Sequence, residues 1–338
     1  MDGVLVIDKP TGPTSHDIVA RARRAVGEPH VGHTGTLDPA ASGVLALVLG
    51  RATRLARFLT AGDKSYEAVI HLGFSTDTAD AQGAPIGTRY SGPWPTRLEI
   101  EAGLGPFRGR FLQQPPIYSA KKIDGTRSYR LARAEARRRT SGSSQVSIAA
   151  PGAESVVLDT ASEPPPKRPV PVEVTAHRLE ILSLEGDRLG LRVECSAGFY
   201  VRSLAHDLGD RLGTGAHLSS LRRTRSGDYG LAEALPIDVV ERDLAAAVAG
   251  VVPLEAMLPR LPAVVLTPAG ITRARHGREL GPAEFTALSL RAARDELELP
   301  ALSEADGWVR LLAPAGQLVG LGRRGSSSGL LHPSVVLI

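Results

Sequence analysis

The chain has 338 residues, which is long for a single domain and predicts two. Its hydrophobic content of 42% is ordinary for a globular protein, and no apolar run approaches the ~20 residues of a membrane-spanning helix. The single cysteine, Cys195, excludes an internal disulfide and fits a reducing compartment. Since no charged-then-apolar leader is evident, we expect a cytoplasmic protein with no membrane partner.

The formal net charge is only +4, but the basic residues are clustered. Residues 121–139 hold eight lysines and arginines against two acidic side chains. Two further clusters consist of arginines, namely Arg21, Arg23 and Arg24, and Arg211, Arg222, Arg223 and Arg225. Such runs are most often solvated faces. Three of them beside motif-like segments favour a polyanionic partner, most simply a nucleic acid.

The first elements in chain order are a strand, a turn and a helix. Residues 4–7 form a short apolar run, which ends in a stretch rich in Pro and Gly at residues 9–13. Thr14 and Asp17 have the spacing of a capping box, with aspartate in place of the usual Glu or Gln. Apolar residues then recur at helical spacing between residues 18 and 26, which leaves arginines on the outer face.

Residues 32–54, GHTGTLDPAASGVLALVLGRATR, place a polar loop directly before an apolar run. Rigid scaffolds often present reactive side chains on such loops. Asp38 is the best candidate, because Pro39 fixes the backbone after it and favours an extended Asp38. The plain alternative is that Asp-Pro only makes a turn, which holds for most such pairs. The apolar run at residues 44–49 could be a buried strand or a helix, since periodicity does not decide between them.

Two later segments also carry aromatic or basic candidates. Residues 65–73 alternate apolar side chains, beginning with Tyr66, which predicts a strand. Residues 191–201 predict another strand, with Cys195 in the core, and residues 203–212 a helix. On a strand, Tyr200 and Arg202 would share one face, where they could stack a base and hold a carboxylate. Strands and helices in no regular alternation predict a mixed α/β or α+β sheet.

The composition changes at two places further along the chain. From residue 138 to 171, Ser, Gly, Ala and Pro dominate, which predicts a flexible surface insertion. Residues 259–262 are the expected domain linker. Beyond them, apolar runs at residues 264–266, 308–312 and 318–321 predict a small β-rich domain.

Motifs for metals and common cofactors are missing from the sequence. His30, His33 and Asp38 do not have a standard zinc spacing, and no second ligand cluster accompanies them. The glycines at residues 32–35 lack the Gly-Lys-Ser/Thr ending of a phosphate-binding loop. No nucleophile-elbow pattern supports acyl transfer. We therefore expect no metal and no cofactor.

Several blocks of the chain together resemble a known family. They are GVLVIDKPTGPTSHD, GHTGTLDPAASGVL, DKSYEAVIHLGFSTDTADAQG, PPIYSAKKIDGTRSYRLAR, CSAGFYVRSLAHDLG and GAHLSSLRRTRSG. In this order they closely resemble the bacterial TruB-type tRNA pseudouridine synthases, over roughly residues 3–227. The Lys-Pro block and the Gly-His-Thr-Gly-x-Leu-Asp-Pro block are the specific ones.

The resemblance implies a fold and a reaction. The fold would be α+β, with a mixed, mainly antiparallel sheet and flanking helices at residues 1–258, interrupted by the insertion at about 138–166. Residues 259–338 would form a small β-rich, PUA-like RNA-binding domain. The enzyme would isomerise the T-loop uridine of tRNA, position 55, to pseudouridine. It would act on the T arm as a monomer, without cofactor, metal or guide RNA.

The resemblance also assigns roles to residues, with Asp38 as the essential carboxylate. The target base must leave its stack in the RNA. Whether Asp38 attacks C1′, attacks uracil C6 or removes a ribose proton stays open. By the same resemblance, Arg202 would hold Asp38, and Tyr66 would stack on the uracil and assist removal of the C5 proton. Tyr200 and Leu221 would line the pocket, and His33 would fill the space that the base leaves in the RNA. Lys9 would shape the loop or contact phosphate.

A protein of another class would fit the basic clusters equally well, namely a non-catalytic tRNA-binding folding chaperone. Such a chaperone has no physical need for a carboxylate within a surface that binds phosphates. The intact set of Asp38, Tyr66 and Arg202 therefore favours the enzyme.

Overall fold

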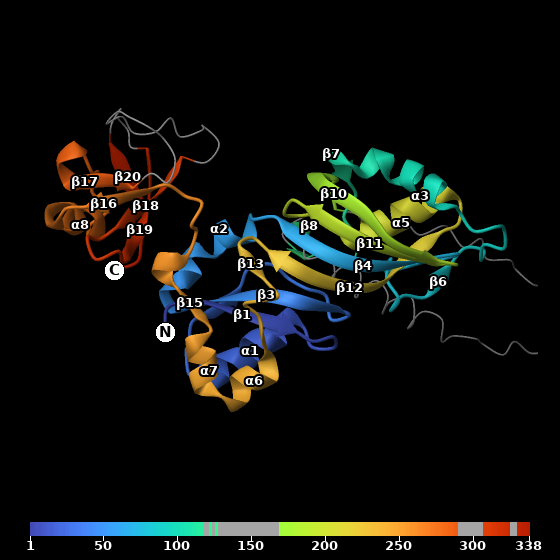
Figure 1. The fold of residues 1–338 in the computed structure, drawn as a ribbon, viewed down its shortest axis with the longest axis horizontal. Helices are drawn as coiled ribbons and strands as arrows, with labels where there is room; N and C mark the ends of the chain where they lie inside the picture. Colours follow the sequence, from blue (N-terminus) through green and yellow to red (C-terminus); the bar gives the residue numbers. More distant parts are fainter. Residues whose placement is uncertain (118–121, 124–125, 128–168, 290–306, 325–329) are drawn as a thin grey trace, which may run out of the picture. The chain divides into compact units, whose positions relative to one another are not determined.

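The computed structural model describes residues 1–117, 122–123, 126–127, 169–289, 307–324 and 330–338 (Figure 1). The expected insertion at residues 138–166 lies outside these residues, as does most of the basic run at 121–139. The described chain divides into two compact units. The first unit comprises residues 1–64 and 222–338, and the second comprises residues 65–221. The division at residue 258 that the sequence suggests stays a prediction.

The sheet of the first unit is built around β1 (Gly3–Lys9), which is buried along almost its whole length. β1 pairs antiparallel with β3 (Ala41–Leu49), from Gly3 opposite Leu49 to Lys9 opposite Gly43. On its other side β1 pairs parallel with β14 (Leu235–Pro236) and antiparallel with β15 (Val251–Pro253). β12 (Ala216–Ser226) follows β3 in the strand order. The run at residues 44–49 is therefore a strand, because its apolar side chains are buried on both faces of the sheet.

Helix α1 (Ser15–Val26) begins where the sequence predicts a capping box. The Thr14 side chain accepts a hydrogen bond from the Asp17 backbone, and the Asp17 carboxylate accepts one from the Thr14 backbone. The helix ends at Gly27, which has a left-handed conformation. Its apolar face buries Ile18 and Val19, and it contacts α6 (Ile237–Arg242) and α7 (Leu244–Ala249).

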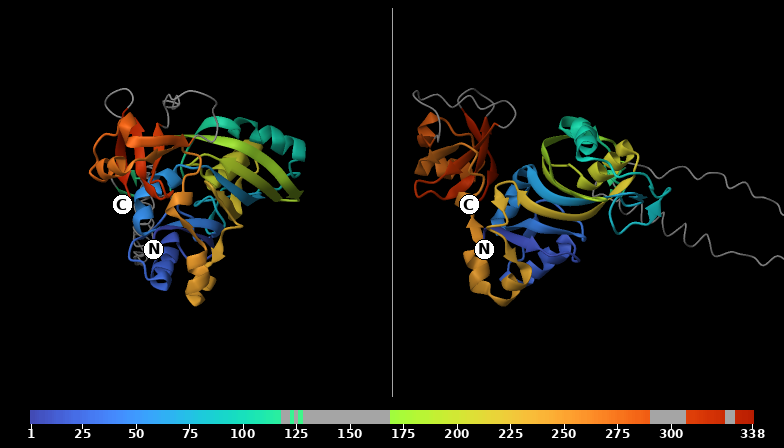
Figure 2. Two further views of the ribbon diagram at one scale, coloured as in Figure 1. Left: turned by 60° about the vertical axis from the view of Figure 1, so that its left-hand side comes forward. Right: turned by 45° about the vertical axis from the view of Figure 1, so that its right-hand side comes forward.

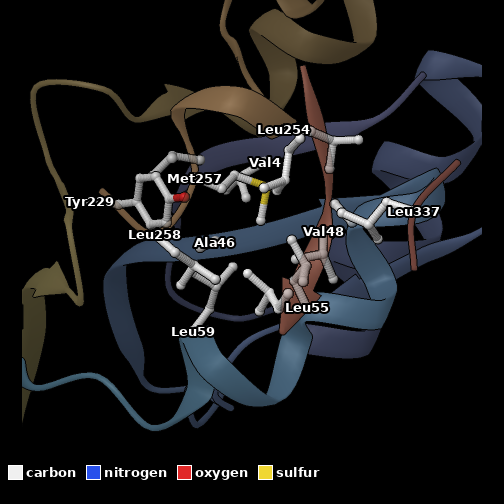
Figure 3. Packing of buried hydrophobic residues seen from close by; sticks show 14 of the residues in the cluster. Val4, Ala46, Val48, Leu55, Leu59, Tyr229, Leu254, Met257, Leu258 and Leu337 are labelled. Atoms are coloured by element: carbon white, nitrogen blue, oxygen red, sulfur yellow. The ribbon is translucent and has the colours of Figure 1, made fainter. Parts of the chain in front are cut away.

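The main core of the first unit joins segments that are far apart in the sequence (Figure 3). Val4 of β1 and Val48 of β3 pack with residues of η1 (Gly50–Leu55), α2 (Ala56–Thr60), β13 (Tyr229–Gly230) and η3 (Leu254–Ala256). Leu337, close to the C-terminus, is fully buried in the same cluster. The C-terminal segment is therefore part of this core.

A second sheet lies in the C-terminal part of the first unit (Figure 2). Its strand order is β17 (Phe285–Ser289), β16 (Ala263–Leu266), β18 (Trp308–Leu312), β19 (Leu318–Arg324) and β20 (Leu331–Val336). β16 and β18 are parallel, and the other neighbours are antiparallel. With α8 (Pro268–Arg275), this sheet encloses its own core, and η4 (Pro282–Glu284) packs on α8. The β-rich C-terminal region expected from the sequence is confirmed.

The second unit contains an antiparallel sheet with helices packed beside it. Its strand order is β4 (Lys64–Leu72), β11 (Arg188–Cys195), β10 (Val172–Glu185) and β7 (Gly109–Gln113). The alternation predicted for β4 is confirmed, since Tyr66, Ala68, Ile70 and Leu72 are all buried. α3 (Arg97–Leu104) packs on α5 (Val201–Leu212). The remaining elements are β2 (Val31–His33), β5 (Ser75–Thr76), β6 (Pro85–Ile86), η2 (Gly105–Phe107), β8 (Lys122–Ile123) and β9 (Thr126–Arg127).

The strand predicted at residues 191–201 is wrong in its second half. β11 ends at Cys195, which is buried as expected, and α5 begins at Val201. Between them, Gly198 has a φ of +85°, a conformation that ends a strand and strongly favours glycine. Tyr200 is the residue that precedes the helix, and Arg202 lies in its first turn. These two side chains therefore do not share a strand face.

The fold class is the α+β arrangement expected, with mainly antiparallel sheets and flanking helices. No helix in the described ranges is long and apolar enough to span a membrane.

Candidate active site

Asp38 lies in the connection between β2 and β3, which form an antiparallel hairpin with His33 opposite Leu47. The Asp38 carbonyl accepts a hydrogen bond from the Ala41 N–H at 3.0 Å, so the Asp-Pro pair does make a turn. The residue is half-buried. The turn and the functional interpretation are compatible, because the turn fixes the backbone from which the carboxylate projects.

Lys9, at the end of β1, binds main-chain carbonyls of this turn. Its side chain is fully buried, and its Nζ donates hydrogen bonds to the carbonyls of Pro10 at 2.8 Å and Ala41 at 2.7 Å. The Pro39 carbonyl lies 3.5 Å from the same nitrogen and also accepts a bond from the Gly12 N–H at 2.8 Å. These hydrogen bonds tie the Lys9 side chain to main-chain carbonyls on both sides of the Asp-Pro pair.

Arg223 of β12 holds the first half of the loop. It is 1% exposed, although the sequence placed it in a basic surface cluster. That expectation is wrong for this residue. Its Nε donates to the Val44 carbonyl at 2.7 Å, its Nη2 to Gly35 at 3.1 Å and its Nη1 to Thr36 at 3.5 Å.

The middle of the loop is held from helix α1. The Ser15 hydroxyl donates to the Leu37 carbonyl at 3.0 Å and accepts from the Leu37 N–H at 2.9 Å. Thr34, at the start of the loop, donates its N–H to the Ala46 carbonyl at 3.1 Å. The backbone on both sides of Asp38 is therefore fixed by groups from three elements, which is how a site preorganises a reactive side chain.

The electrostatics of the loop combine two buried cations with one carboxylate. Burial lowers the pKa of the Lys9 ammonium to about 8, the nearby Asp38 carboxylate acts in the opposite direction, and Arg223 adds to the lowering. The structure thus brings Asp38, Lys9 and Arg223 into one electrostatic cluster. In the part of the chain that the structure describes, no group of His, Cys, Asp and Glu is arranged to hold a metal.

His33 also belongs to the first unit, at the end of β2, directly before the loop. It is half-buried, and its ring lies edge-on to that of His16 at 5.3 Å between centroids. His33 and Asp38 are therefore carried by the same hairpin.

The other candidate residues lie in the second unit. Arg202 is 7% exposed in the first turn of α5, where its Nη1 lies 3.5 Å from an Asp80 carboxylate oxygen and donates to the Thr78 carbonyl at 3.3 Å. Asp80 is itself oriented, since its other oxygen accepts from the Thr78 hydroxyl at 2.7 Å and from the Gln82 N–H at 3.0 Å. A turn of the chain after β4 thus fixes the guanidinium.

The main chain of Tyr200 is fixed by a pair of hydrogen bonds. Its N–H donates to the Gln113 side-chain oxygen at 2.8 Å, and its carbonyl accepts from the same amide at 3.0 Å. Gln113 is 1% exposed, so this reciprocal pair sets the start of α5 from inside the unit. Tyr66 is 9% exposed on β4, and Leu221 is half-buried on β12.

Comparison with known proteins matches most of this chain to one family. The model of the TruB family pseudouridylate synthase N-terminal domain matches residues 23–154, and the model of the tRNA pseudouridylate synthase B C-terminal domain matches residues 202–258. A tRNA pseudouridine synthase B of Solibacter usitatus is 40% identical over 341 residues and covers 100% of both chains. One of Geobacillus thermodenitrificans is 39% identical and covers 95% of this chain and 94% of its own. The chain belongs to the TruB family of pseudouridylate synthases.

Solved structures of related proteins have the same fold. A chain of a Cbf5-Nop10-Gar1 complex superposes with a TM-score of 0.66 at 25% identity, covering 99% of this chain and 85% of its own. A chain of an H/ACA RNP bound to a substrate RNA containing 2′-deoxyuridine gives 0.65 at 25% identity with the same coverage. The pseudouridylate synthase fold is therefore shared along nearly the whole TruB chain.

The two family models include candidate residues of both units. Asp38 and Tyr66 lie within the N-terminal match, and Arg202, Leu221 and Arg223 within the C-terminal match. Lys9 precedes both matches.

Sequence reasoning missed three residues that hold the candidate side chains. Ser15, Asp80 and Arg223 were not considered as positioning residues. Ser15 had no signal, because its partner, Leu37, lies 22 residues away. Asp80 carried a signal, because it ends a polar stretch, TDTAD, directly after a predicted strand. Arg223 carried no such signal, because the residues of β12 do not alternate regularly between buried and exposed.

Proposed function

We propose that this TruB-family chain isomerises uridine to pseudouridine in tRNA, with Asp38 as the essential carboxylate. Its full-length relatives carry the name tRNA pseudouridine synthase B. The observation that carries the proposal is the Asp38 loop, whose backbone is fixed by the buried side chains of Lys9, Arg223 and Ser15. Such a fixed carboxylate suits a reaction in which the reacting groups must be held in register.

The reaction breaks the C1′–N1 bond of uridine, rotates the uracil and forms a C1′–C5 bond. It is an isomerisation, so no electrons are gained or lost and no group donor is required. The Asp38 carboxylate would act as nucleophile at C1′ or C6, or as the base that removes a ribose proton. A proton leaves C5 at the end and one is gained at N1, so the atoms balance.

The other candidate residues take roles around this carboxylate. Arg202, already oriented by Asp80, would hold Asp38 by a charge-assisted hydrogen bond. Tyr66 would stack on the flipped uracil and assist removal of the C5 proton, while Tyr200 and Leu221 line the pocket. His33 would occupy the space that the base leaves in the RNA.

The proposed substrate is the T arm of tRNA, with the uridine at position 55 of the TΨC loop. The exposed arginines of the basic clusters support a folded RNA partner. The β-rich region at residues 259–338 would add RNA contacts as a PUA-like domain. The chain aligns over its full length with a bacterial tRNA pseudouridine synthase B, and we propose that it acts as a cytoplasmic monomer without a guide RNA.

The test is to incubate the purified protein with an unmodified tRNA transcript, and to locate pseudouridine in the product. A T-arm minihelix should also be modified, whereas a hairpin of the same composition with a scrambled loop should not. Binding should weaken steeply with salt, because phosphate contacts release counterions. Equal modification of the scrambled hairpin would contradict T-loop recognition. Binding without any pseudouridine would favour the folding chaperone instead.

A further inference from the structure

We propose that Arg223 is a positioning residue for Asp38, one that acts on turnover through the loop backbone and not through the RNA. The proposal rests on the proposed function, in which Asp38 is the reacting carboxylate. Arg223 sets the position of the carboxylate by joining the two sides of the hairpin that carries it.

The hydrogen bonds of Arg223 reach both sides of the turn. Nη1 and Nη2 bind carbonyls of Thr36 and Gly35, which precede Asp38, while Nε binds the carbonyl of Val44 on β3, which follows it. One planar guanidinium therefore sets the separation between the two arms of the hairpin. A lysine could satisfy one or two of these carbonyls, but it lacks the rigid fork that fixes all three.

The backbone around Arg223 is built for this contact. Gly43, at the start of β3, has a φ of +101°, and a Cβ placed there would lie 2.2 Å from the Arg223 carbonyl oxygen. No other residue would fit, so glycine lets β12 approach β3 closely enough for the guanidinium to reach the loop. Gly35 has a φ of +121°, and the Arg223 Nη1 lies 3.6 Å from where its Cβ would be.

Direct contact with RNA does not explain Arg223, because only 1% of it is exposed. Its neighbour Arg222 differs, since it is 41% exposed and pairs with Asp8 at 2.8 Å. Burying a guanidinium also costs desolvation free energy that an apolar side chain in the same place would avoid. A role of Arg223 in holding the Asp38 loop explains why a charged side chain is buried here.

The experiment compares Arg223→Met and Arg223→Lys with matched changes at Arg310. Arg310 of β18 also donates from its guanidinium to main-chain carbonyls, those of Leu261 and Glu255, but in the C-terminal sheet. The rate of one turnover is measured with enzyme in excess, and the Kd for a tRNA transcript is measured separately. We expect Arg223→Met to lower the rate by roughly 100-fold and Arg223→Lys by about 10-fold, with the Kd nearly unchanged.

Further readouts separate positioning from general stability. Amide hydrogen exchange in the peptide that holds residues 34–41 should accelerate in the Arg223 variants and stay unchanged in Arg310→Met. Millimolar guanidinium should restore part of the rate of Arg223→Ala, because the ion can occupy the vacated site. If Arg223→Met does not fold, Arg223→Lys, which keeps the charge, decides the question by its rate and exchange.

Several outcomes would overturn the proposal. A weaker Kd with an unchanged rate would make Arg223 an RNA contact. Equal rate losses in Arg223→Met and Arg310→Met would mean that Arg223 only stabilises the fold. If the wild-type protein forms no pseudouridine, the proposed function itself is contradicted, whatever the amide hydrogen exchange of the loop shows.

Discussion

The Asp38 loop and the start of α5 use charged side chains in opposite ways. At the loop, the buried cations Lys9 and Arg223 bind main-chain carbonyls. At α5, the buried cation Arg202 lies against the carboxylate of Asp80 and donates to the Thr78 carbonyl. In the first region the cations fix the backbone, whereas in the second a carboxylate fixes the cation.

The difference concerns how each region holds its charged groups. Cations committed to carbonyls contribute a positive field that does not need to reorganise, and such fields favour a nearby anion throughout a reaction. The loop thus supplies fixed electrostatics, whereas at α5 the Asp80 carboxylate orients the Arg202 guanidinium.

The largest effect should come from removing the Asp38 carboxylate. Asp38→Asn keeps the turn, because the Asp38 carbonyl makes the hydrogen bond to Ala41. We expect turnover to fall by at least roughly 10³-fold while the Kd for tRNA changes little, since one carboxylate is a small term among many phosphate contacts. Single-turnover assays and filter binding measure the two quantities.

Deamidation of Asp38→Asn would restore aspartate, so mass spectrometry of the sample and a parallel Asp38→Ala variant are required. Asp8→Asn is the matched control, since its carboxylate pairs with Arg222 on the surface of the same unit. Appreciable turnover by verified Asp38→Asn would contradict the proposed mechanism.

An intermediate effect is expected at the second region. Asp80→Asn removes one negative charge from beside the buried Arg202 guanidinium, and the free energy of unfolding should fall by about 1–3 kcal/mol. Turnover should fall by roughly 10- to 100-fold, because Arg202 loses its orientation. Urea unfolding and single-turnover rates test this prediction.

Asp77→Asn is the matched control. The Asp77 carboxylate is exposed and accepts a hydrogen bond from the Ala84 N–H in the same turn, so its loss should change turnover little. Equal turnover losses in both variants would show that only the shape of the turn matters.

The local elements of both regions could be predicted because their signals are local. The capping box at Thr14 and the alternation of β4 need only a few neighbouring residues. The supporting contacts could not be predicted in the same way, since Arg223 and Val44 are separated by 179 residues and Arg202 and Thr78 by 124. A charge cluster in sequence does not say which of its members a strand turns inward.

The end of β11 shows a different limit. Apolar and aromatic residues continue past Cys195, so the pattern alone favours a longer strand. The strand ends at Cys195, and Gly198 with its positive φ lies in the turn that follows. A glycine inside an apolar pattern is ambiguous between a bulge and a break. The role assigned to Arg202 does not depend on this error, because the helix that replaces the strand still buries its side chain.

The last effect, which bears on stability and not on turnover, is a pH dependence that arises at the Asp38 loop. Lys9 titrates near 10.5 in the unfolded chain, and burial lowers its pKa to about 8 in the folded protein. Between these values the unfolded chain binds more protons than the folded one, so the free energy of unfolding rises with pH, by at most ~1.4 kcal/mol per pH unit. Below the folded pKa, the full penalty of burying the charge is present, and above the unfolded pKa it is gone.

Lys9→Met removes this titration. The difference in unfolding free energy between the wild type and Lys9→Met should therefore shift in favour of the wild type as the pH rises from about 8 to 10.5. Urea unfolding at intervals across this range measures the difference, in which the other titrating groups largely cancel. Parallel curves for the two proteins would mean that Lys9 has an ordinary pKa. In that case the carbonyl hydrogen bonds and the Asp38 charge would offset the desolvation of the buried lysine, and the contrast with the Arg202–Asp80 pair would rest on hydrogen-bond partners alone.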